Sequence, residues 1–274
     1  MTYTWLYAVA RAGPDPLPPE IPGGVADEGP RTVTADGLLA VVGSVPAPDF
    51  DADALQRHLG EPQWLERTAR AHHRVVAAVG SRALPVRFGT VYRDDDRVRA
   101  LLTEHADGFR TALAGIADRT EWGVKAYQER TDPDAAAEGD GPPDGPPDDR
   151  PGTAYLLRRR SARDRADRAL TDAADRARQV HRTLAGLADR STEHPPQPPE
   201  ASGVREPMLL NGAYLVHRSR AAEFARAVTG LQGLHGPALR VELTGPWPPY
   251  SFADLPTGAT GATEPTEPTG GDAG

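Results

Sequence analysis

The adjacent histidines His72 and His73 are the first residues that could do chemistry, because imidazole serves as a metal ligand and as a general base. A zinc site of the His-Glu-x-x-His type places its two histidines on one face of a helix with a glutamate between them. No such motif is present, and Glu66 lies six residues before His72. We therefore expect His72 to pack on the inner face of a helix and His73 near its edge, with no metal. A metal-dependent hydrolase that uses His72 and His73 is the alternative.

Other reactive groups are scarce. The chain has no cysteine, which excludes thiol nucleophiles, thiolate zinc sites, iron–sulfur clusters and disulfides. Lys125 is the only lysine and follows a valine, so a Walker A loop is excluded. The acidic run Asp94–Asp96 suits a helix N-terminus, where negative charge is stabilising without a metal. We predict that the chain is not an enzyme and holds no cofactor.

Charge and hydropathy exclude further classes of protein. The formal net charge is −8 at pH 7, and no basic stripe outweighs the acids, which argues against general nucleic-acid binding. No apolar run is long enough to cross a bilayer, and residues 1–10 lack the basic region of a signal peptide. We expect a cytoplasmic protein.

Aromatic residues next to prolines are better candidates for a binding site. The segment 244–254 has three prolines, and proline cannot donate to a strand ladder, so we expect an extended arm there. Its aromatic side chains could be exposed anchors for a partner, or they could fold back and seal their own domain. We expect residues 246–252 to pack back near the junction of two domains, with Trp247 and Tyr250 largely buried. The arm and two strand-like blocks supply the candidate partner-binding or structural residues: Arg87, Phe88, Trp122, Trp247, Tyr250 and Phe252.

The pattern of elements predicts an α+β protein. Residues 3–10, 31–34 and 38–45 look like strands, and Asp36-Gly37 predicts a hairpin turn. Helices are expected near 62–79 and after Asp94–Asp96, with a strand at 84–88 between them and a closing strand at 120–128. This order suggests an antiparallel sheet covered by helices on one side. A long helix at 154–187, strands at 208–216 and 238–243 and a helix at 219–231 follow.

Composition divides the chain into two small domains. We predict an N-terminal domain at 1–130, a disordered acidic Pro/Gly linker at 131–152, a C-terminal domain at 153–255 that includes the arm, and a disordered tail at 256–274. In the helix 154–187 an alanine-rich stripe permits close approach of a neighbour, so a homodimeric scaffold is a further alternative.

Six blocks together resemble the gas vesicle protein F/L family. They are Tyr3-Thr4-Trp5-Leu6-Tyr7-Ala8-Val9, Trp64 with His72, the segment 84–92, Glu121-Trp122-Gly123-Val124-Lys125, Ala154-Tyr155-Leu156 and the segment 244–252. The resemblance implies two α+β domains, of which the first is a modified ferredoxin-like domain. It implies an accessory protein of gas vesicle assembly, associated with gas vesicles, that binds the small hydrophobic shell subunit and other accessory proteins. Nucleation or an ATP-independent holdase role would fit, and the F and L members are not distinguished.

Overall fold

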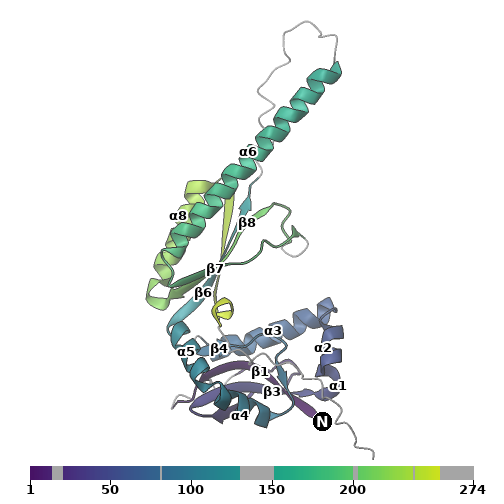
Figure 1. Ribbon diagram of the computed structural model, residues 1–274, viewed down its shortest axis with the longest axis vertical. Helices are drawn as coiled ribbons and strands as arrows, with labels where there is room; N and C mark the ends of the chain where they lie inside the picture. The colour runs from purple at the N-terminus through teal and green to yellow at the C-terminus, as the bar shows by residue number, and fades with distance from the viewer. Residues whose placement is uncertain (14–20, 81, 130–150, 200–202, 237, 254–274) are drawn as a thin grey trace, which may run out of the picture. The chain divides into compact units, whose positions relative to one another are not determined.

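The computed structural model describes residues 1–13, 21–80, 82–129, 151–199, 203–236 and 238–253, and for 151–158 the backbone alone. The chain forms two compact units (Figure 1). The first contains Met1–Thr120 together with the residues from Trp247 onward, and the second contains Glu121–Pro246. Each unit has its own antiparallel sheet and its own helices, which confirms the α+β class expected from the sequence.

The sheet of the first unit is built around β1 (Thr2–Arg11). Its strand order is β2-β3-β1-β4, from β2 (Arg31–Ala35), β3 (Leu38–Pro46) and β4 (Ala83–Pro85), and β5 (Val91–Tyr92) also pairs with β1. All of these pairings are antiparallel. The turn between β2 and β3 has positive φ at both Asp36 (53°) and Gly37 (73°), as the Asp-Gly pair predicted.

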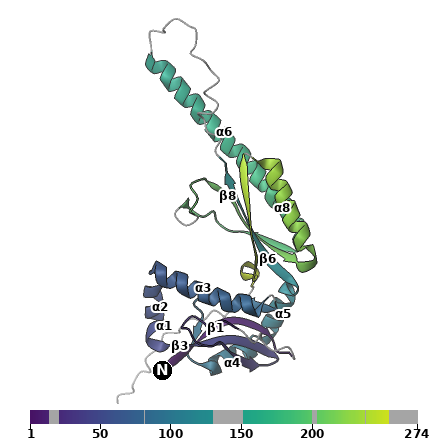
Figure 2. The same ribbon diagram turned by 180° about the vertical axis from the view of Figure 1, so that it is seen from behind.

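Helices cover both faces of this sheet, which corrects the expectation of one covered face. Seven consecutive residues of β1, from 4 to 10, are buried, and because side chains alternate along a strand both faces must be covered. Helix α3 (Pro62–Val79) packs on one face together with α1 (Ala47–Phe50), and α2 (Ala52–His58) precedes α3. Helices α4 (Asp95–Glu104) and α5 (Ala106–Ile116) lie on the other face (Figure 2).

The second unit has a four-stranded sheet with order β7-β8-β6-β9. Its strands are β6 (Arg119–Gln128), β7 (Arg190–Glu193), β8 (Met208–His217) and β9 (Leu239–Trp247). Helices α6 (Pro151–Ala185) and α8 (Ala221–His235) lie side by side on one face (Figures 1 and 2). The short helix η1 (Arg218–Arg220) leads into α8.

Only the second half of α6 contributes to this core. Ala173, Ala177, Val180 and Leu184 are buried at helical spacing. Residues 159–172 are all exposed. Figure 1 shows this part of the helix running beyond the strands of its own sheet. A helix segment exposed on every side gains little from packing, so its surface is available to a partner.

The unit boundaries differ from the expected domains 1–130 and 153–255. The strand expected to close the first sheet is β6, and it pairs within the second sheet, where Val124 and Ala126 join the core. The arm expected in the C-terminal domain belongs to the first unit from Trp247 onward. Local patterns show that a segment is a strand but not which sheet it joins. The expected linker falls mainly, and the expected tail entirely, outside the described residues.

None of the helices in the described part of the chain is both long enough and apolar enough to span a bilayer.

Candidate functional site

The C-terminal arm is anchored in the first unit by its last residues. Pro249 is buried, and Phe252 is 2% exposed within the short helix η2 (Tyr250–Phe252). Backbone hydrogen bonds join the Tyr250 N–H to the Pro248 carbonyl at 2.8 Å and the Phe252 N–H to the Pro249 carbonyl at 3.2 Å. Tyr250 is half-buried, but Trp247 is 41% exposed. The arm thus folds back as expected, while the expected burial of Trp247 is wrong.

Trp247 and Tyr250 contact two adjacent histidines of α3. The Trp247 ring lies 5.4 Å from the His73 ring at an interplanar angle of 67°. The Tyr250 ring lies 6.2 Å from His73 and 6.4 Å from His72. Such edge-on and tilted contacts are favourable geometries for aromatic rings. The proline-rich arm is therefore held on α3 by ring contacts with His72 and His73.

His72 continues the contacts into the core. Its ring centroid lies 5.9 Å from that of Trp5 on β1 and 5.7 Å from that of Phe88. The Trp5 indole N–H donates a 3.0 Å hydrogen bond to His72 Nδ1. Nδ1 must be unprotonated to accept it, so the neutral ring carries its proton on Nε2. Burial lowers the pKa of His72 to about 4, opposed by an interaction with the Val86 backbone.

The metal-site alternative at His72 and His73 finds no support in this geometry. His72 is 3% exposed, and its Nδ1 is occupied by Trp5. Within the described ranges, no three His, Cys, Asp or Glu side chains are grouped closely enough to hold a metal ion. His73 is occupied by ring contacts with the arm. The pair positions the arm and α3 against the core.

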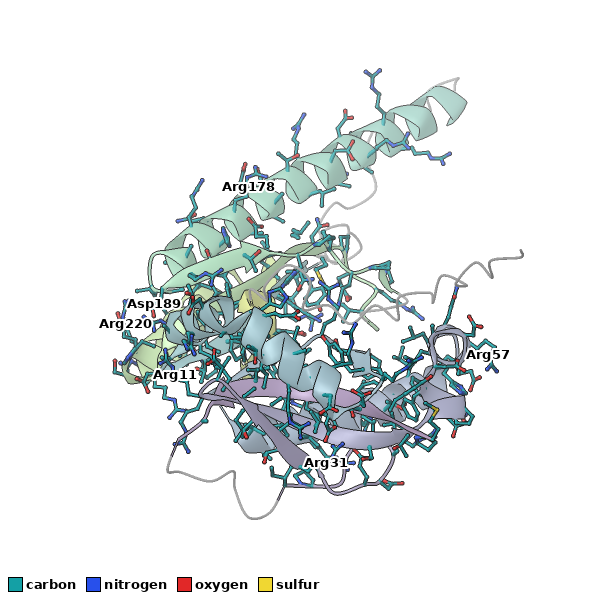
Figure 3. The ribbon with its side chains drawn as sticks, turned by 60° about the horizontal axis from the view of Figure 1, so that its bottom comes forward. Arg11, Arg31, Arg57, Arg178, Asp189 and Arg220 are labelled. Atoms are coloured by element: carbon teal, nitrogen blue, oxygen red, sulfur yellow. The ribbon has the colours of Figure 1, made fainter. Side chains whose placement is uncertain are left out.

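The acidic run Asp94–Asp96 has structural partners for each of its carboxylates. Asp94 accepts the Arg97 N–H at 2.9 Å and caps α4, as negative charge at a helix start predicted. Asp95 accepts a hydrogen bond from the Thr4 hydroxyl at 2.8 Å and pairs with Arg31 of β2 at 2.6 Å (Arg31 is labelled in Figure 3). Asp96 pairs with Arg99 one turn on. These contacts tie α4 to β1 and β2.

The remaining sequence candidates lie in different units. Phe88 packs in the core of the first unit, 5.3 Å from Trp5, while Arg87 beside it is exposed. Trp122 belongs to the second unit, where its ring lies 6.3 Å from Phe224. The indole N–H of Trp122 has no hydrogen-bond partner among the described residues. Five of the six candidates, all except Trp122, belong to the first unit.

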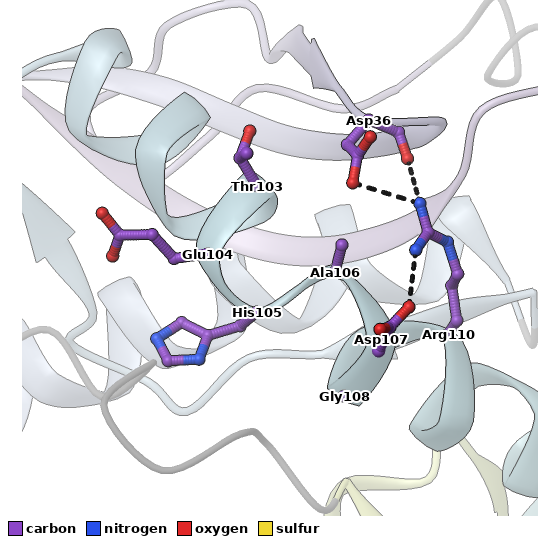
Figure 4. A pocket seen from close by; sticks show the side chains of 8 residues that line it. All are labelled: Asp36, Thr103, Glu104, His105, Ala106, Asp107, Gly108 and Arg110. Atoms are coloured by element: carbon purple, nitrogen blue, oxygen red, sulfur yellow. Dashed lines mark hydrogen bonds and ion pairs between the residues drawn. The ribbon is translucent and has the colours of Figure 1, made fainter.

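A shallow recess lies at the junction of α4 and α5, with a volume of about 300 Å³ (Figure 4). Arg110 spans its rim and donates to the Asp36 carbonyl at 2.7 Å, to Asp36 Oδ2 at 3.2 Å and to Asp107 Oδ1 at 2.8 Å. Through these hydrogen bonds Arg110 links α5 to the turn between β2 and β3.

Sequence reasoning did not assign Trp5 or His73 to the arm site, and His73 was considered only as a metal ligand or a helix-edge residue. Trp5 sits in a strand of continuous apolar residues, which indicates core and nothing more specific. His73 was placed at a helix edge without a partner, because the residue it contacts comes 174 positions later, at Trp247. Pairings at such separation have no local signal.

The comparisons with known proteins agree over nearly the whole chain. Residues 3–254 match the family model described as gas vesicle synthesis protein GvpL/GvpF. The chain is 41% identical over 253 residues to gas vesicle protein L of Streptomyces sp. (strain CB03234), covering 92% of each. It is 28% identical over 262 residues to gas vesicle protein F of the same strain, covering 92% of this chain and 99% of the relative.

Solved structures show the same fold. The crystal structure of gas vesicle protein GvpF from Anabaena sp. PCC7120 superimposes with a TM-score of 0.61 at 20% identity, covering 93% of this chain and 98% of that chain. That of GvpF from Microcystis aeruginosa gives a TM-score of 0.57 at 20% identity, covering 92% and 99%. Together with the family match from residue 3 to residue 254, which spans both units, these findings show that the chain belongs to the GvpL/GvpF family of gas vesicle synthesis proteins.

Proposed function

We propose that this protein is an accessory factor of gas vesicle assembly that binds the small hydrophobic shell subunit and other accessory proteins. The family match over residues 3–254 carries the proposal, because it covers the arm and both folded units. The factor would act in the cytoplasm, at the growing vesicle.

The physical role would be to hold or to nucleate the shell subunit. A shell that faces gas needs a very apolar surface, and an unassembled subunit with such a surface aggregates. A protein that binds it without consuming ATP shifts the equilibrium by mass action alone. Nucleation would use the same binding, with the bound subunit serving as the first element of the shell.

The two Streptomyces relatives support an L-type assignment within the family. Identity is 41% to the L protein and 28% to the F protein of one strain, at equal coverage of this chain. An L-type protein would leave an F-type relative to act beside it in the same cell. We therefore expect that an F-type gene from the same cluster does not replace this one.

Deletion of the gene tests the proposed function. We expect the deletion strain to form few or malformed vesicles and the intact gene to restore them, as counted by electron microscopy. Purified protein should also retain the shell subunit when the two are co-expressed. A deletion strain with normal vesicles would contradict the proposal.

A second candidate function, a homodimeric scaffold, is supported by the exposed part of α6. Ala162, Ala166 and Ala169 continue the face that packs on the sheet through Ala173, and they are exposed. In an antiparallel pair centred near Ala166, Arg163 of each copy would face Asp167 of the other, which favours self-association. Sedimentation equilibrium of the full chain and of an Ala166→Glu variant measures it. A protein that stays monomeric at high concentration excludes this candidate.

A further inference from the structure

We propose that the outer edge of β2 (Arg31–Ala35) pairs with the same edge of a second copy of this chain. The sheets of the two first units would then join into one continuous antiparallel sheet through β2. This self-association goes beyond the proposed function and does not depend on it, and it uses a surface other than the exposed part of α6.

Strand β2 lies at one end of its sheet, and among the described strands it pairs with β3 alone. The turn between them consists of Asp36-Gly37, both at positive φ, so Ala35 and Leu38 form the hydrogen-bonded pair that closes the hairpin. Hydrogen-bonded pairs alternate along an antiparallel ladder. Every second residue of β2, counted back from Ala35, therefore turns its N–H and C=O toward β3. The residues between them, Thr32 and Thr34, turn theirs away from the sheet.

The neighbouring ladder supports this orientation of the backbone. The Ala12 N–H donates to the Gly37 carbonyl at 2.9 Å, so at this end of β3 the residue before Leu38 bonds toward β1 and Leu38 is left to bond toward β2. Thr32 and Thr34 are both exposed, and their outward backbone groups have no hydrogen-bond partner among the described residues. A row of unpaired backbone donors and acceptors is the chemistry that binds another extended strand.

The other sheet edges in the described part of the chain are protected against such pairing. Strand β4 is buried throughout and ends in Pro85, which cannot donate to a ladder. Strand β7 has four residues, with Arg190 and Glu193 at its two ends. On β9 the Val241 N–H already donates to the side chain of Gln232 on α8. Proline, charge and covering groups are the usual means by which proteins prevent edge-to-edge association.

Strand β2 has none of these protections. Its sequence, Arg-Thr-Val-Thr-Ala, contains no proline, lysine or glycine, and its register with β3 runs without a shift. Its one charged side chain, Arg31, is paired with Asp95 of α4 at 2.6 Å. The edge is therefore regular, uncovered at its two outward residues and without an unpaired charge, as an edge that accepts a further strand must be.

The edge is complementary to itself. In an antiparallel pair centred on Val33, Thr32 of each copy lies opposite the partner's Thr34, and each such pair can exchange two backbone hydrogen bonds. Threonine opposite threonine is a favourable cross-strand pair. Pro30 and the turn at Asp36 bound the strand, so a register shifted in either direction leaves fewer of the outward groups paired. The strand thus specifies both the register and the two-fold symmetry of the contact.

The charges at the two ends of β2 favour the same orientation. Arg31 begins the strand and Asp36 follows it, so an antiparallel pair brings Arg31 of each copy near the partner's Asp36. A parallel pair would instead place like charges together. Asp36 is bound by Arg110 through Oδ2 at 3.2 Å (Figure 4), and its Oδ1 has no partner among the described residues. This charge complementarity points to a second copy as the occupant of the edge.

The oligomeric state of the full chain, measured by sedimentation equilibrium, tests the contact. The paired segment is short, so we expect a weak dimer with a Kd of about 10–100 µM. Thr32→Lys with Thr34→Lys places like charges opposite one another and should raise the Kd at least about tenfold. Thr32→Lys with Thr34→Glu places opposite charges there and should restore association to within about threefold of the wild type.

Matched controls separate the β2 edge from other surfaces. Gln56→Lys with Gln63→Lys adds the same two charges at exposed positions of α2 and α3 in the same unit, and it should leave the Kd unchanged. A chain that stays monomeric up to about 500 µM overturns the proposal. So does wild-type association of the double-lysine variant of β2, or a failure of the lysine–glutamate variant to associate. Dimerisation that only Ala166→Glu abolishes would belong to α6 and would likewise overturn it.

Amide hydrogen exchange followed by NMR locates the contact on the backbone. Between about 10 µM and about 1 mM protein, the amides of Thr32 and Thr34 should become protected by about tenfold or more, because they enter a new ladder. The amide of Val33 is already bonded to β3 and should change little. If the chain dimerises while Thr32 and Thr34 exchange equally fast at both concentrations, another surface forms the dimer and the proposal is wrong.

Discussion

The indole N–H of Trp5 donates a 3.0 Å hydrogen bond to Nδ1 of His72, which joins the first strand of the chain to helix α3 inside the core. His72 is 3% exposed, and Trp5 is fully buried. The bond exists only while Nδ1 is unprotonated, so protonation of the imidazole would break it and leave a charge in the core. The arm contacts the same histidine through Tyr250.

Acid should therefore destabilise the first unit through His72. The pKa is lowered from 6.5 to about 4 in the folded protein, so between these values the unfolded state binds more protons and stability falls as the pH falls. The contribution is complete above about pH 6.5, and about 2 kcal/mol of it is lost by about pH 5. Urea unfolding of the full chain at the two pH values measures the loss.

The control for this prediction replaces the titrating group. In His72→Gln the amide oxygen can still accept the Trp5 indole N–H but does not titrate, so most of the difference between the two pH values should disappear. His105→Gln, at the junction of α4 and α5, should keep the difference. If His72→Gln keeps it as well, the acid sensitivity has another origin.

Gly43 on β3 should not tolerate a side chain. A Cβ there would lie 1.9 Å from Glu28 Oε1 and 3.1 Å from Tyr7 Cε2. The Glu28 carboxylate accepts the Tyr7 hydroxyl at 2.8 Å and the Ala26 N–H at 2.9 Å, and displacing it would break both bonds. We expect Gly43→Ala to destabilise the protein by about 1–3 kcal/mol, as measured by denaturant unfolding.

Gly115 on α5 is the matched control for Gly43. A Cβ at Gly115 would meet nothing within 4 Å, and its position is helical and exposed. Gly115→Ala should therefore stabilise the protein by about 0.5–1 kcal/mol. A loss at Gly115 as large as that at Gly43 would show that the contact with Glu28 is not the cause.

Turn residues and the spacing of apolar residues correctly predicted individual turns and helices. Asp36-Gly37 produced the turn with two positive φ angles, and the apolar period produced α3 from Pro62 to Val79 as expected. The strand β7 was missed because Arg190–Glu193 has no apolar residue. The helix expected after Asp94 is interrupted at His105, where φ is −115° and ψ is 21°. Neither feature has a signal in the hydropathy pattern.

The sequence did not predict which distant segments of the chain pair with one another. Nothing near β6 indicates that it joins β8 and β9 rather than β1, because its alternation of side chains suits either sheet. The arm was correctly expected to fold back, since proline lowers the entropy cost of ordering it. Its partner His73 and the exposure of Trp247 depend on the shape of α3, which only the folded structure provides.

Tyr214 should stabilise the second unit through its hydroxyl. The side chain is fully buried, and its oxygen lies 2.9 Å from His181 Nδ1 on α6, whose Nε2 lies 3.5 Å from Glu193 of β7. Tyr214→Phe leaves the ring and removes the hydrogen bond, so we expect a loss of about 0.5–1.5 kcal/mol. Thermal unfolding monitored by circular dichroism measures it.

Tyr127 of β6 provides the comparison. It is 1% exposed, with Arg240 4.7 Å from its ring centroid, and its hydroxyl has no hydrogen bond within the described part of the chain. Tyr127→Phe should change the melting temperature little. An equal loss in both variants would mean that the loss at Tyr214 does not come from its hydrogen bond with His181.

Truncation to alanine should cost much more stability at Phe252 than at Trp247. Phe252 is 2% exposed, and its removal would leave a cavity beneath the arm, so Phe252→Ala should cost about 3–5 kcal/mol of unfolding free energy. Trp247 is 41% exposed, so Trp247→Ala should cost less than about 1 kcal/mol. A chain ending after Leu243 should lose stability as Phe252→Ala does, whereas one ending after Leu255 should not. If Trp247→Ala destabilises as much as Phe252→Ala, the exposed part of Trp247 does not lessen its contribution to the stability of the unit.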